Sequence, residues 1–190
     1  MIYLSKDNSY DILAARGMMH SKEDDVYNFL NDQDYRVRTL AAQTIQTHFP
    51  TEKSFNIAKN MVLSKDPVKQ ELGAYILGQL GTPKMPFWKE SLPLLLKLLR
   101  SNNTEVVAAT LHALGHLCSL KKCKLKDGSI QEIINLTKHK SKDIVIAALM
   151  ALASQDFSTQ AKNTIKKFLE TDDEEVKSWA DVAYEIIENI

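Results

Sequence analysis

The chain has 190 residues, of which 44% are hydrophobic and 25% are charged, and its 24 Lys and Arg residues balance 24 Asp and Glu residues. This composition is typical of a soluble globular protein, and we expect one domain over residues 1–190. A protein that holds nucleic acid through phosphates usually carries a basic excess, so the zero net charge argues against that class.

The sequence carries no sign of export or of membrane insertion. The first residues, Met1–Asp7, lack the charged start and the long apolar stretch of a secretory signal. No apolar run reaches the roughly 18 residues that a membrane span needs. Two cysteines are too few for a disulfide framework. We therefore expect a cytoplasmic protein that does not engage a membrane.

Helical spacing of apolar residues runs along the chain, without an alternating stretch long enough for a sheet, so we expect an all-α fold. A first helix is predicted over Ser9–His20. Five helix pairs are predicted after it: Lys22–Leu30 with Tyr35–His48, Glu52–Leu63 with Pro67–Leu80, Trp88–Leu99 with Thr104–Leu120, Ser129–His139 with Asp143–Ala153, and Ser158–Leu169 with Asp173–Ile187.

The second helix of each pair begins with a version of one short phrase. An apolar residue, here called the opener, is followed four and five places later by apolar or small residues and near the eighth place by another apolar residue, with departures at Thr110 and Asp181. The openers are Val37, Val68, Val106, Ile144 and Val176, which are 31, 38, 38 and 32 residues apart. Such self-similarity with helical spacing is typical of an α-solenoid, in which the openers and their partners face the core.

Polar clusters precede all five second helices and predict where these helices start. Ser, Thr, Asn and Asp side chains accept hydrogen bonds from the free N–H groups of a first helical turn, and carboxylates there oppose the helix dipole. Pro67 suits a first helical position. Pro93 either begins or kinks its helix. Two insertions, Thr82–Phe87 and Lys121–Gly128, lengthen the third and fourth repeats, and the first of them is expected to bulge from one edge.

Three of these segments resemble HEAT-type repeats, particularly the short bacterial kind. They are Asp34-x-x-Val37-Arg38-x-x-Ala41-Ala42, Asp66-Pro67-Val68-Lys69 and Glu174-Glu175-Val176-Lys177. The resemblance covers roughly Lys22 to Ile190 and implies an armadillo-like, right-handed α-solenoid of about five helix pairs plus an N-terminal helix. An arginine follows the opener only at Arg38, so the repeats are degenerate. Similar proteins include scaffold subunits, bilin-lyase-like proteins, DNA alkylation-repair proteins and bacterial immunity proteins that block a toxin, and the fold does not choose among them.

Second helices usually line the concave wall of a solenoid, so the positions opposite the core phrase are the candidate partner-binding residues. Small and apolar positions, Ala74, Ala108 and Ile146 among them, are expected on the same wall. Met150 is notable because a large apolar group facing solvent often marks a contact site, whereas for Trp179 we favour a place capping the core of the last repeat. The candidates are Arg36, Thr39, Gln43, Gln70, Glu71, Glu105, His112, His116, Asp143, Met150 and Trp179.

Motifs for catalysis or metal binding are absent from the sequence. His112 and His116 lie four apart on one helical face, with Cys118 and Cys123 close by, but no CxxC pair and no HExxH phrase occurs. No phosphate-binding glycine loop and no GxSxG elbow is found. Cys118 is interpreted as an apolar core residue. We therefore expect no metal, no cofactor and no enzymatic activity.

The sequence favours a non-enzymatic module that binds another protein through its concave face. The most specific form of this hypothesis is a bacterial immunity protein that neutralises a cognate toxin. Acidic clusters such as Glu23–Asp25 and Asp172–Glu175 would suit a basic toxin domain, although carboxylates at helix starts also have an ordinary stabilising role. The alternatives are a nucleic-acid-binding or alkylation-repair-like protein, and a lyase-like or chaperone protein for a small ligand.

Overall fold

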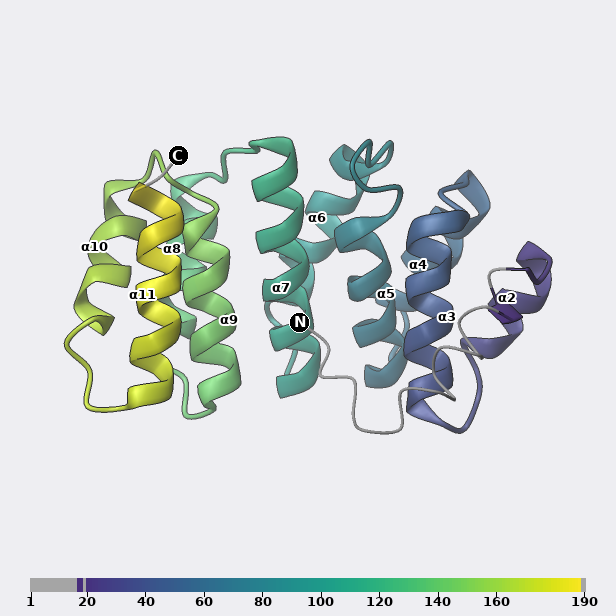
Figure 1. Ribbon diagram of the computed structural model, residues 1–190, viewed down its shortest axis with the longest axis horizontal. Helices are drawn as coiled ribbons and strands as arrows, with labels where there is room; N and C mark the ends of the chain where they lie inside the picture. Colours follow the sequence, from purple (N-terminus) through teal and green to yellow (C-terminus); the bar gives the residue numbers. More distant parts are fainter. Residues whose placement is uncertain (1–16, 19, 189–190) are drawn as a thin grey trace.

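The computed structural model describes residues 17, 18 and 20–188, and this part of the chain is helical without any strand (Figure 1). The predicted helix pairs are confirmed, with ends that differ by three residues at most, whereas the predicted helix Ser9–His20 lies largely outside the described residues. The helices are α2 (Glu23–Phe29), α3 (Tyr35–His48), α4 (Glu52–Val62), α5 (Pro67–Gln79), α6 (Trp88–Leu98), α7 (Thr104–Lys121), α8 (Asp127–Leu136), α9 (Lys142–Ala153), α10 (Thr159–Phe168) and α11 (Glu174–Glu188).

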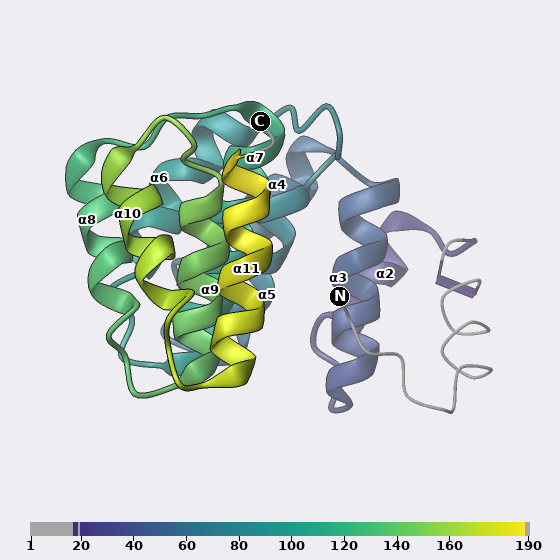
Figure 2. The ribbon, with the colours of Figure 1, turned by 60° about the vertical axis from the view of Figure 1, so that its left-hand side comes forward.

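The helices stack as an α-solenoid in two layers, as predicted. The second helices α3, α5, α7, α9 and α11 stand side by side in one layer, and the first helices lie behind them (Figures 1 and 2). Neighbouring second helices contact each other far more extensively than neighbouring first helices do. The stack therefore curves toward the second helices, whose free face is the concave side.

Side-chain caps begin four of the five second helices at the predicted polar clusters. Each capping side chain accepts a hydrogen bond of 2.9–3.2 Å from a backbone N–H two or three residues further on. Pro67 occupies the first turn of α5, as expected. The capping residues are Asp34, Asp66, Asn103 and Asp173. Helix α9 differs, because Ser141 makes no such side-chain bond.

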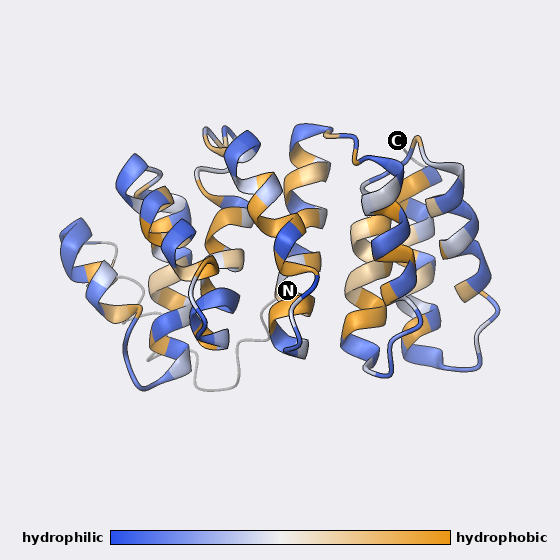
Figure 3. Ribbon diagram, turned by 180° about the vertical axis from the view of Figure 1, so that it is seen from behind, coloured by the Kyte–Doolittle hydropathy of each residue, from blue (hydrophilic) through white to orange (hydrophobic). Residues whose placement is uncertain are grey.

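The hydrophobic faces of the helices meet between the two layers (Figure 3). Most openers lie there: Val106, Ile144 and Val176 are buried and Val37 is partly buried. The prediction for Val68 is wrong, since this side chain is 43% exposed. The buried residues of α5 begin only at Leu72, so its first turn projects past the packed layer. None of the described helices is long and apolar enough to cross a membrane.

Small residues let the second helices approach each other closely. A methyl group on Gly78 of α5 would stand 2.6 Å from both Cα and Cβ of Ala113 on α7, which is closer than side chains come in real structures. Ala74 and Ile146 were expected on the open concave wall, but both are buried. That expectation is wrong because the close approach of the second helices covers these positions.

Two residues of the insertion Thr82–Phe87 pack against the fold, and its other four residues are exposed at this edge. Met85 is only 1% exposed, and the Phe87 ring stacks on Phe55 of α4 with ring centroids 5.0 Å apart. The insertion therefore extends the core at this end of the helices. Pro93 lies inside α6 and does not begin it.

Candidate functional site

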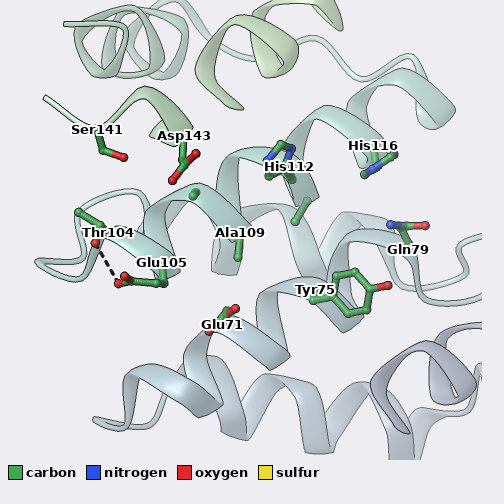
Figure 4. A pocket seen from close by; sticks show the side chains of 12 residues that line it. Glu71, Tyr75, Gln79, Thr104, Glu105, Ala109, His112, His116, Ser141 and Asp143 are labelled. Atoms are coloured by element: carbon green, nitrogen blue, oxygen red, sulfur yellow. Dashed lines mark hydrogen bonds between the residues drawn. The ribbon is translucent and has the colours of Figure 1, made fainter. Parts of the chain in front are cut away.

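A groove with a volume of about 710 Å³ opens on the concave face across α5, α7 and α9. Helix α7 occupies its middle and presents Glu105, His112 and His116. Glu71 rises from α5 on one side, and Asp143 from the start of α9 faces it across α7 (Figure 4). These five residues were all predicted as partner-binding candidates, and the structure brings them together. We call this site the acidic groove.

Three carboxylates give the acidic groove its charge. No ion pair involves Glu71, Glu105 or Asp143 within the described part of the chain. Loss of water around Glu71 and repulsion from Glu105 raise the pKa of the Glu71 carboxyl, although Arg38 partly opposes this. Hydrogen bonds from its own backbone N–H and from the Thr104 hydroxyl lower the pKa of Glu105. Within the described residues, the groove therefore holds three carboxylates that form no ion pair, and Arg38 offsets their charge only in part.

The surroundings of the two histidines disfavour the charged form of each imidazole. Desolvation and the nearby His116 lower the pKa of His112, with Asp143 acting in the opposite direction, and desolvation also lowers the pKa of His116. Neutral imidazole can both donate and accept a hydrogen bond. Among the described residues, no three His, Cys, Asp or Glu side chains gather as a metal site. The pair is thus suited to hydrogen bonding with a polar group that enters the groove.

A smaller, mainly apolar pocket of about 300 Å³ adjoins the acidic groove. Its lining includes Met150 from α9 and Trp179 and Ile186 from α11, and it shares His112 and His116 with the groove. Trp179 remains 39% exposed and lines this pocket, so our preferred interpretation of it as a core cap is wrong. We call this second site the tryptophan pocket. The concave face therefore joins an acidic site to an apolar one.

Four predicted residues lie outside both sites. Arg36 is ion-paired at 2.7 Å with the side chain that caps its own helix, and the Thr39 hydroxyl donates to a backbone carbonyl 2.9 Å away within α3. Gln43 is exposed on α3. Gln70 donates a 2.8 Å hydrogen bond to the Ser64 carbonyl and lines a different pocket, between α5 and α6. The candidate site is therefore concentrated on α5, α7, α9 and α11.

Four polar residues that line the acidic groove were not among the candidates predicted from the sequence. Tyr75 and Gln79 follow Glu71 at intervals of four on α5, and all three line the acidic groove (Figure 4). Thr104 and Ser141 line its rim. Residues four apart lie on the same face of a helix, so the position of Glu71 could have predicted Tyr75 and Gln79.

A model of the HEAT repeat family matches residues 92–120, which span most of α6 and nearly all of α7. This segment contains the central helix of the acidic groove. No curated protein sequence matches the chain. The sequence match is therefore confined to one repeat. The other repeats are similar to known repeat proteins in structure only.

Solved structures with the same arrangement extend over the whole chain. An engineered protein superposes with a TM-score of 0.61 at 18% identity, covering 98% of this chain and 93% of its own. The Escherichia coli protein YibA gives a TM-score of 0.58 at 16% identity, over 95% and 78% of the two chains. A designed armadillo repeat protein in complex with the peptide (KR)4 gives 0.60 at 14% identity, over 95% and 92%. The chain is thus a helical repeat protein of the HEAT and armadillo-like fold.

Proposed function

We propose that this chain is a non-enzymatic module that binds a basic segment of another protein in its acidic groove. The observation that carries the proposal is the convergence of Glu71, Glu105 and Asp143 from three different helices without an ion-pair partner among the described residues. A Lys or Arg side chain entering the groove would supply the missing counter-charge. The designed armadillo repeat protein that superposes on this chain is itself in complex with the basic peptide (KR)4.

Because of the tryptophan pocket, we expect the bound segment of the partner to carry an apolar residue close to its basic residue. Met150 and Trp179 expose large apolar surfaces there, and aromatic side chains are the usual anchors of protein interfaces. An extended segment that places a basic side chain over Glu105 can place an apolar one against Trp179 by crossing the two histidines. A phosphate backbone would meet repulsion from the same carboxylates, which disfavours the nucleic-acid alternative.

The more specific proposal is that the partner is a toxin with a basic surface and that the chain neutralises it as an immunity protein. Complementary charge between an acidic site and a basic domain makes association fast and selective, as an immunity protein requires. Affinity purification of the chain from its native cell tests this form. A stoichiometric partner that is toxic when expressed alone and harmless when co-expressed with this chain is the expected result, and the lack of any stoichiometric protein partner would refute it.

Peptide binding tests the broader proposal directly. A fluorescent peptide of alternating lysine and arginine is titrated with the protein, beside a peptide of equal length that carries glutamine at every position. The double variant Glu71→Gln/Glu105→Gln should bind the basic peptide about tenfold more weakly, equivalent to ~1.4 kcal/mol, because two ion pairs are lost.

A matched control removes the same charge elsewhere. Glu90 and Glu170 are exposed and lie on or beside the first-helix layer, so Glu90→Gln/Glu170→Gln should leave the affinity unchanged. Equal weakening in both double variants would mean that only net charge attracts the peptide, and the groove proposal would fail. Equal binding of the glutamine peptide would have the same consequence.

A further inference from the structure

The chain has two cysteines, and the fold places them against each other. The Sγ atoms of Cys118, on α7, and Cys123, in the following loop, lie 2.7 Å apart. Both are free thiols, with relative exposures of 0% and 7% respectively. They lie outside the acidic groove and the tryptophan pocket, and the proposed binding function does not use them.

The end of α7 explains why residues five apart meet. Lys122 adopts a left-handed conformation with φ 48° and ψ 37°, and its N–H is bonded to the Cys118 carbonyl. The N–H of Cys123 is bonded to the same carbonyl at 3.2 Å. This pattern folds the chain back over the last helical turn and commonly sets an apolar contact there. In this chain the contact is made by two thiols.

A buried glutamine holds the loop in this position. Gln155 is fully buried, and its Nε2 donates to the Cys123 carbonyl at 3.3 Å. Its Oε1 accepts a 2.9 Å hydrogen bond from the N–H of Leu125, which is also buried. Gln155 thus holds the loop at Cys123 and at Leu125, and the approach of the two sulfurs is built into the packing of α7 against the segment after α9.

We propose that Cys118 and Cys123 form a dithiol site that small-molecule disulfides, of the oxidised glutathione class, convert to an intramolecular disulfide. The Cys123 thiolate attacks one sulfur of the oxidant, which forms a mixed disulfide and releases one glutathione thiolate. Cys118 then attacks Sγ of Cys123 and releases the second. The two protein thiols lose two electrons and two protons in all. The oxidant takes up these electrons and protons and becomes two molecules of reduced glutathione.

The surroundings assign the attacking role to Cys123. Cys123 borders a cleft of about 130 Å³ whose charged lining residues are Lys122, Lys124 and Asp156. The two cations outnumber the one carboxylate, which suits the carboxylates of glutathione. The hydrogen bond with Cys118 lowers the pKa of the Cys123 thiol. The same neighbour, together with burial, raises the pKa of Cys118. Cys123 therefore borders the cleft and has the lower pKa of the two thiols, and Cys118 is enclosed behind it as the resolving group.

Thiol counting with intact mass measurement tests the proposal. The reduced protein is incubated with oxidised glutathione, alkylated and weighed. The wild type should lose both thiols, weigh two hydrogen atoms less and remain monomeric on a non-reducing gel. The variant Cys118→Ser should stop at a single glutathione adduct on Cys123, because no resolving thiol remains. Cys123→Ser should stay unmodified, since Cys118 is enclosed.

Several outcomes would overturn the inference. Native wild-type protein that keeps both thiols, while urea-unfolded protein loses them under the same oxidant, would show that the folded site does not react. A stable glutathione adduct on the wild type would show that the pair does not close. Disulfide-linked dimers as the main product would show that the sulfurs react between chains and not within one.

Discussion

Replacing Gly78 with alanine should destabilise the protein, although alanine is the better helix former. Gly78 lies inside α5 and faces Ala113 of α7. The new methyl would stand 2.6 Å from Cα and Cβ of Ala113, and the first of these belongs to the backbone. No rotamer change can relieve such a contact, so α5 and α7 must move apart.

Two opposing contributions set the size of the effect. Overfilling a packed interface costs about 1–3 kcal/mol. Alanine in place of glycine within a helix returns roughly 0.5–1 kcal/mol. The free energy of unfolding should therefore fall by up to about 2.5 kcal/mol in Gly78→Ala. Because α5 and α7 form two walls of the acidic groove, its width should change as well.

Gly115 supplies the matched control on α7. A methyl there would stand 3.4 Å from Cα of Ala151, an ordinary van der Waals contact. Gly115→Ala should therefore keep only the helix-propensity gain and raise the free energy of unfolding by up to about 1 kcal/mol. Urea unfolding followed by far-UV circular dichroism and tryptophan fluorescence measures both variants. If Gly78→Ala proves as stable as Gly115→Ala, the close packing of the second helices is not what the structure describes.

Three further predictions concern a cap, a buried amide and two histidines. Asn103→Ala removes the side chain that caps α7 and should cost about 1 kcal/mol in urea unfolding, whereas Asn103→Asp should cost little. Gln155→Leu leaves the Leu125 N–H unpaired and should cost roughly 1–3 kcal/mol, with faster hydrogen exchange in the loop after α7; unchanged exchange would contradict the anchoring role. His112 and His116 have lowered pKa values, so the unfolded chain takes up their protons first as pH falls. The Tm should therefore drop on acidification below the ordinary histidine pKa of about 6.5, and less so in His112→Gln/His116→Gln; an identical drop in both would refute this assignment.

Helix positions could be predicted because each signal is local. The cap at Asp66, the proline that follows it and the apolar spacing of α5 all lie within a few residues. What remained hidden depends on neighbouring helices. Val68 and Val106 are both openers, yet Val68 is 43% exposed and Val106 is buried, because the packed part of α5 begins one turn later than that of α7.

The thiol pair was beyond sequence reasoning for a related reason. Cys118 and Cys123 are five residues apart, a spacing that places side chains well apart around a regular helix. Their contact depends on the left-handed conformation of Lys122, which a non-glycine residue rarely adopts and no local signal announces. Hydrogen bonds of Gln155, which lies about thirty residues further along the chain, hold the loop that follows this turn.

The sequence offered two explanations for the acidic clusters Glu23–Asp25 and Asp172–Glu175, compensation for helix dipoles and a surface for a basic partner, and the same two apply to the carboxylates of the acidic groove. The stacking of the helices makes the two explanations compatible. Glu105 and Asp143 are each the second residue of a second helix, where a carboxylate opposes the positive end of the dipole. The second helices stand side by side in the same direction, so their starts form one rim of the groove. Carboxylates that stabilise separate helix starts therefore lie together on this rim (Figure 4). Glu71 lies a turn further in, where desolvation and Glu105 disfavour its charge. No helix start accounts for that position, so among the three groove carboxylates Glu71 is the one whose charged form the proposed basic partner would favour most.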